Sequence, residues 1–188
     1  MQGTRILAVA VEVVAFLFAA FGGFLVGIAP PDEADASFAV GLGSVLALGV
    51  LLWMAAAKRS WFRGRRRKVL LLLAAGCLVL AAVVSTSYWH QRDRLTFPYP
   101  PGQVEPRYLA GTEFTAPGRR YVETHGETKT LSEMVDEFGG LANRERIWTR
   151  ESMGRARMLL IGLYLASVLT ISVGIFSLTE GLLGKVSK

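Results

Sequence analysis

Two carboxylates lie inside long apolar stretches of the sequence, where an ionisable group is costly. Glu12 occurs in AVAVEVVAF, and Glu180 occurs in SLTEGLL at a comparable distance from the end of its own apolar stretch. A charged side chain costs at least about 2.5 kcal/mol at the centre of a bilayer and less near its surface, so it should face protein or water. The two residues are consistent with an ion or proton path, with ion pairs to Arg5 or to the basic segment 63–68, or with side chains that extend toward the membrane surface.

The histidines and the remaining acidic residues do not form a recognised catalytic or metal-binding motif. His90 and His125 have acidic neighbours, but neither spacing matches a known metal site, and zinc needs three or four ligands in fixed geometry. The sequence contains no HExxH, GxSxG or P-loop motif. We therefore expect a chain that is not an enzyme and that binds no metal and no cofactor.

Four apolar segments determine the expected fold. They cover about residues 6–28, 38–57, 69–87 and 158–183. A helix rises 1.5 Å per residue, so about 20 residues match a hydrocarbon core of about 30 Å. A soluble helix would carry polar residues at every third or fourth position, and VLLLLAAGCLVLAAVV has none. The sequence predicts an all-α integral membrane protein with four transmembrane helices; a cleavable signal peptide is the alternative for the first segment.

The distribution of charge predicts how the four helices are oriented. The segment KRSWFRGRRRK, residues 58–68, has seven positive charges and no negative one, whereas the link at 29–37 has three acidic residues and no cation. Short loops rich in Lys and Arg stay in the cytoplasm, so both termini and residues 58–68 are expected there. Cys77 is the single cysteine, which excludes an intramolecular disulfide and is compatible with a bacterial inner membrane.

The basic loop at 58–68 is expected to bind anionic lipid headgroups. A short loop between two spans lies at the headgroup surface, where each Lys or Arg gains roughly 1 kcal/mol from anionic lipid. A cytoplasmic protein partner is the alternative, and nucleic acid is disfavoured. The residues assigned to this lipid and topology anchor are Lys58, Arg59, Trp61, Arg63, Arg65, Arg66, Arg67 and Lys68.

Between the third and fourth helices the sequence predicts a small extracytoplasmic cap. The expected domains are a three-helix part at 1–87, a linker and helical cap at 88–157, and the fourth helix with its cytoplasmic tail at 158–188. The aromatic pair at 88–89 marks the membrane interface, and FPYPPGQVEP, residues 97–106, has four prolines and predicts an extended polyproline II spacer.

The cap sequence also contains clear helix signals. Thr115 is expected to cap a helix over APGRRYVETH that ends at Gly126. Thr130 and Glu133 have the spacing of a capping box for a second helix, which stops at the glycine pair 139–140. Thr149 is expected to cap a helix that continues without a break into the fourth span, over more than about 30 residues.

Small residues recur at short intervals in the expected spans. Such stripes let helices approach closely within a bilayer and predict helix packing and assembly. The residues are Gly23, Gly27, Gly43, Ala47, Gly162, Ala166, Thr170 and Gly174. We therefore expect a non-catalytic membrane subunit or scaffold that forms a homo-oligomer or a membrane complex, with the cap docking a partner. The alternative is a small oligomeric channel or pore, a sensor or stress effector, with Glu12 or Glu180 near its cytoplasmic mouth.

Overall fold

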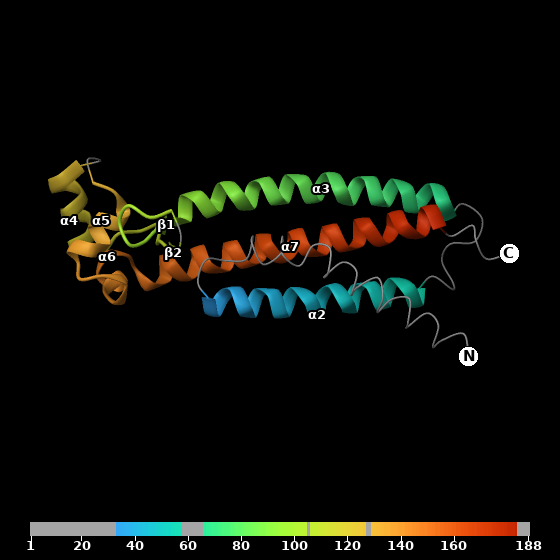
Figure 1. Cartoon of the computed structure of the whole chain (residues 1–188), viewed down its shortest axis with the longest axis horizontal. Coiled ribbons are helices and arrows are strands. Elements are labelled where there is room, and N and C mark those ends of the chain that lie inside the picture. The colour runs from blue at the N-terminus through green and yellow to red at the C-terminus, as the bar shows by residue number, and fades with distance from the viewer. Residues whose placement is uncertain (1–32, 58–65, 105, 127–128, 184–188) are drawn as a thin grey trace. The chain divides into compact units, whose positions relative to one another are not determined.

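The computed structural model describes residues 33–57, 66–104, 106–126 and 129–183 (Figure 1). These residues are mostly helical and divide into two compact units. One unit, which we call the helical unit, comprises residues 37–57, 66–87 and 163–183. The other, which we call the cap unit, comprises residues 33–36 and the described part of 88–162.

Two helices in the described part of the chain are long and apolar enough to cross a membrane. They are Lys68–Leu95, within α3 (Arg66–Leu95), and Arg150–Thr179, within α7 (Arg150–Leu183). Helix α2 (Glu33–Ala57) contains a shorter apolar helix, Phe38–Trp53. The first expected span, residues 6–28, lies outside the described residues.

Helix α3 extends beyond the boundary that the sequence predicts. The third apolar segment was expected to end at about residue 87, where the linker begins, and α3 continues to Leu95. The added residues include Gln91, Arg92 and Arg94, which favour helix, and no glycine or proline interrupts them. The helix ends where strand β1 (Thr96–Pro98) begins.

Helix α2 approaches α7 closely at Gly43, which belongs to a buried stripe of residues at every fourth position. Ala39, Gly43 and Ala47 are buried, and Leu51 continues the same stripe. A Cβ atom on Gly43 would lie 3.4 Å from a methyl carbon of Leu165, so the backbone of α2 approaches α7 closely. Figure 1 shows α2 and α3 both running beside α7, which is thus the central helix of this unit.

Helices α3 and α7 meet through small residues of α7 that are spaced seven apart. Ser85 donates a hydrogen bond to Ser167 over 3.4 Å. Seven residues further along α7, a Cβ on Gly174 would lie 3.2 Å from Leu78, and after seven more a Cβ on Gly181 would lie 3.0 Å from Leu71. The partners on α3 are also seven apart, and a seven-residue repeat is typical of antiparallel helices crossing at about 20°.

The two short cap helices form as their sequence signals predict. Helix α4 (Ala116–His125) is capped by Thr115, whose hydroxyl accepts a hydrogen bond from the Gly118 amide, and it ends at Gly126. Helix α5 (Leu131–Glu137) has both hydrogen bonds of the capping box between Thr130 and Glu133. Helix α7 begins immediately after Thr149, whose hydroxyl accepts from the Ser152 amide at 3.3 Å.

The proline-rich segment is not an extended spacer, and this prediction is wrong. Strand β1 pairs antiparallel with β2 (Arg107–Leu109), so the segment closes a β-hairpin. The Ala110 amide donates to the Leu95 carbonyl at 2.8 Å and fixes the hairpin to the end of α3. The prolines fit because most of them lie in the turn, where they need no amide hydrogen.

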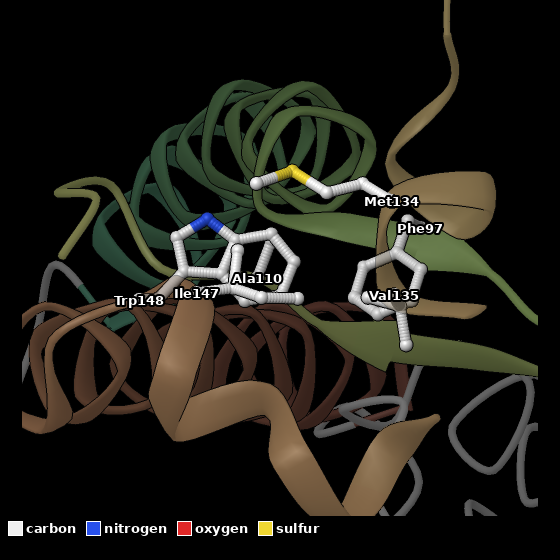
Figure 2. Close-up of a cluster of buried hydrophobic side chains, with 6 residues drawn as sticks. All are labelled: Phe97, Ala110, Met134, Val135, Ile147 and Trp148. Atoms are coloured by element: carbon white, nitrogen blue, oxygen red, sulfur yellow. The ribbon is translucent and has the colours of Figure 1, made fainter. Parts of the chain in front are cut away.

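The cap has its own hydrophobic core, centred on Trp148. This residue follows the short helices η2 (Leu141–Asn143) and α6 (Arg144–Ile147) and is 1% exposed. Its ring lies 5.5 Å from the ring of Phe97 and 6.2 Å from that of Phe114. Figure 2 shows the six buried side chains of this core, namely Phe97, Ala110, Met134, Val135, Ile147 and Trp148.

Candidate functional site

The charged residues selected from the sequence lie mostly outside the described residues. Glu12 and the basic loop residues Lys58, Arg59, Trp61, Arg63 and Arg65 are in this group. Arg66 and Arg67 lie in the first turn of α3, and Glu180 lies in α7, but the structure describes only their backbone. Lys68 is exposed.

The small residues predicted on α7 do not all pack against the same helix. Gly174 faces α3, whereas nothing lies within 4 Å of a Cβ built on Gly162. Ala166 and Thr170 are half-buried, and the Thr170 hydroxyl donates to the Ala166 carbonyl at 2.8 Å. On α2, Gly43 and Ala47 are buried. Gly23 and Gly27 lie outside the described residues.

A pocket of about 370 Å³ opens in the cap unit between α7 and the segment 141–145. Arg150, Met153, Gly154 and Arg157 line it from α7. Leu141, Ala142, Arg144 and Glu145 line it from η2 and α6, and Leu109 contributes from β2. The lining therefore combines an apolar wall with three guanidinium groups and one carboxylate. We call this feature the arginine pocket.

Two of these arginines are held by neighbouring groups. Arg150 donates to a Glu145 carboxylate oxygen from Nε at 2.7 Å and contacts the same oxygen from Nη2 at 2.5 Å. Arg144 donates from Nε to the Leu141 carbonyl at 3.2 Å, and its guanidinium lies 5.9 Å from the centre of the Tyr108 ring. These contacts already restrict the Arg150 and Arg144 side chains, so binding of a ligand to them would cost less conformational entropy.

A second cluster of polar groups lies between α4 and α5. The Tyr121 ring stacks on His125 with a centroid distance of 4.2 Å, and Lys129 forms an ion pair with Glu137. Burial and the neighbouring Glu137 raise the pKa of Tyr121, so its phenol stays protonated at neutral pH. The Lys129 ammonium lowers the pKa of the Glu137 carboxyl. This cluster stabilises the packing of the two helices.

The described residues include no group of three or more His, Cys, Asp or Glu side chains arranged to hold a metal ion. Comparison of the chain with protein-family models, with curated proteins and with solved structures gave no match.

Sequence reasoning did not find the arginine pocket. Part of its signal is local, because Arg150, Met153, Gly154 and Arg157 are spaced so that they lie on one face of a helix. The other part is not local, since the facing segment 141–145 belongs to separate short helices, which the extended residue Trp148 divides from α7.

Proposed function

We propose that the chain is a non-catalytic, multi-pass membrane subunit or scaffold. In this proposal it has four spans, both termini and the basic loop are cytoplasmic, and the cap lies on the opposite side and docks a partner. The membrane is expected to be a bacterial inner membrane.

The exposure of the apolar helices is the observation that carries this proposal. In the most apolar part of α3 only 17% of the residues are buried, and in that of α7 only 44%. Leu72 is 73% exposed and Val79 is 67% exposed. A core helix of a soluble protein buries such side chains, because each one gains about 1.5–3 kcal/mol on leaving water. A hydrocarbon surrounding accounts for the exposure on α3 without that cost.

Exposed small residues on α2 support assembly with a further helix. Gly41, Val45, Gly49 and Trp53 are four apart and exposed, on a different face from the stripe that packs against α7. A Cβ built on either glycine meets no atom within 4 Å, so another backbone could approach closely there. In this proposal the face contacts another span of this chain, a second copy or a partner subunit.

The cap unit supports docking because it combines a stable core with an exposed apolar tip. Its hairpin turn carries Val104, which is 78% exposed, beside the exposed Pro100 and Pro101. Apolar side chains that are already rigid lose little conformational entropy on binding and are therefore suited to contact a partner. The pore alternative stays a prediction, because Glu12 and the Glu180 side chain lie outside the described residues.

Topology can be tested in intact cells, and assembly can be tested on the purified protein. Single cysteines at Glu123 and Ser60, in a Cys77→Ala background, are labelled by a membrane-impermeant reagent added from outside. We expect labelling at 123 and none at 60 until the membrane is opened; the reverse pattern would refute the orientation. Native mass spectrometry in mild detergent should then give an oligomer or a defined complex, and a lone monomer would contradict the subunit proposal.

A further inference from the structure

The arginine pocket has the charge and size of a site for a small anion. Three guanidinium groups and one carboxylate give its lining a formal excess of two positive charges. A volume of about 370 Å³ is within the range of pockets that hold small ligands. Guanidinium groups bind phosphate oxygens with pairs of parallel hydrogen bonds, which makes Arg the preferred residue for phosphate recognition.

Arg150 keeps N–H donors for such an anion. An arginine has five N–H donors, and Arg150 uses two of its nitrogens on a single oxygen of Glu145. Arg150 and Arg157 are seven residues apart on α7 and line the same pocket as Arg144, which comes from α6. An anion in the pocket would therefore be contacted from two different elements.

The position of the pocket along α7 indicates which anion fits. Arg157 is followed directly by Met158 and Leu159, which are 70% and 45% exposed and begin the apolar part of the helix. The pocket itself has an apolar wall made of Leu109, Leu141 and Met153. A ligand that combines a phosphate with a glycerol backbone and acyl chains matches a cationic pocket next to an exposed apolar helix.

We propose that the arginine pocket binds the phosphate of one anionic phospholipid, such as phosphatidylglycerol, at the cap end of α7. This inference rests on the proposed membrane location of α7. It is separate from the basic loop at 58–68, which is expected to bind lipid at the other end of the spans.

The test uses the full-length protein in detergent micelles and native mass spectrometry. Short-chain phosphatidylglycerol, short-chain phosphatidylcholine and inorganic phosphate are titrated separately. Wild-type protein should retain at least one phosphatidylglycerol that Arg144→Gln and Arg157→Gln lose, with affinity reduced about tenfold in each variant, as expected for a charge-assisted hydrogen bond. Binding of phosphatidylcholine should not change.

Arg155→Gln is the matched control. Arg155 lies on the same helix and is outside the pocket, where it pairs with Glu113 at 2.6 Å. This substitution should change phosphatidylglycerol binding by less than about twofold. An equal loss in Arg155→Gln and Arg157→Gln would overturn the proposal, because binding would then follow surface charge alone.

Glu145→Gln provides an outcome that misfolding cannot imitate. It removes the negative charge from the pocket and releases Arg150, so phosphatidylglycerol should bind severalfold more tightly. Weaker or unchanged binding would count against the site. If inorganic phosphate binds as tightly as phosphatidylglycerol, the pocket takes a free phosphate and the lipid assignment is wrong.

Failure of this inference can be separated from failure of the proposed function. Flotation of carbonate-washed protein with phosphatidylcholine vesicles reports membrane integration and does not depend on the pocket. Protein that does not float refutes the membrane proposal and with it the lipid site. Protein that floats but shows no preference for phosphatidylglycerol refutes only the lipid site.

Discussion

The contact between Gly118 and Ile147 provides a sharp test of how the cap is held together. A Cβ on Gly118 would lie 2.4 Å from the Ile147 carbonyl oxygen and 3.2 Å from its carbon. That oxygen already accepts the Thr115 amide at 2.8 Å, so the carbonyl cannot move away without breaking the start of α4. Gly118→Ala should therefore separate α4 from α6.

The size of the effect follows from three opposing contributions. Over-packing costs about 1–3 kcal/mol, and losing the hydrogen bond to Thr115 costs about 1 kcal/mol. Alanine recovers about 1 kcal/mol because it favours helix over glycine. The net loss is about 2 kcal/mol, which corresponds to opening of α4 about thirtyfold more often.

Hydrogen exchange followed by mass spectrometry measures this opening in the full-length protein. Amides of residues 116–126 should exchange about thirtyfold faster in Gly118→Ala than in wild type. Gly154→Ala is the matched control, since Gly154 is helical and nothing lies within 4 Å of its added Cβ. Its exchange should be unchanged or slower. If both variants exchange alike in this segment, the steric reasoning is wrong.

Three further substitutions test the remaining features. Gly174→Val should weaken the pairing of α3 and α7 by about 1–3 kcal/mol, because its added Cβ would lie 3.2 Å from Leu78. Gly162→Val is the control, since nothing lies within 4 Å of a Cβ at that position. Denaturation in mixed micelles compares the two variants, and an equal loss of stability would contradict the close contact at Gly174. The hydrogen bond from the Thr130 amide lowers the pKa of the Glu133 carboxyl from its ordinary 4.5. The stabilisation of α5 by the ionised Glu133 is therefore complete above pH 4.5 and is lost as the pH falls through the lowered pKa. Exchange in α5 should lose that pH dependence in Glu133→Gln, and its persistence would mean that another group causes it. Trp148→Ala should cost about 3–5 kcal/mol in thermal unfolding, and Trp89→Ala, at a 40% exposed position, should cost much less.

The helix starts of the cap could be predicted because their causes are local. Thr115, Thr130 and Thr149 each satisfy amides within the next three residues, and side chains at that distance are visible in the sequence. The continuous helix α7 follows from the same reasoning, since 34 residues after Thr149 contain no proline.

The β-hairpin could not be predicted because its cause is a pairing between separate segments. Four prolines favour an extended chain, and the sequence does not show that Phe97 pairs with Tyr108. Trp148 was missed for the same reason. With Ile147 it forms a short apolar pair between polar residues. Its burial depends on Phe97 and Phe114, which lie more than 30 residues earlier.

The spacing of small residues on α7 was recognised only in part. A four-residue stripe through Gly162 and Gly174 is visible in the sequence, but its period of four drifts around the helix, because a turn takes 3.6 residues. The contact with α3 instead uses Ser167, Gly174 and Gly181, whose period of seven keeps them on one side. Only the partner helix decides which of the two periods forms the interface.

The seven-residue repeat also limits how α3 and α7 can move. Sliding one helix by a single turn would carry the leucines of α3 away from the glycines that make room for them and place them against larger side chains. The next register with the same match lies seven residues away, which is about 10 Å along the axis. We therefore expect this pair to resist piston-like displacement, so that movement of one helix against the other would be tilt or rotation.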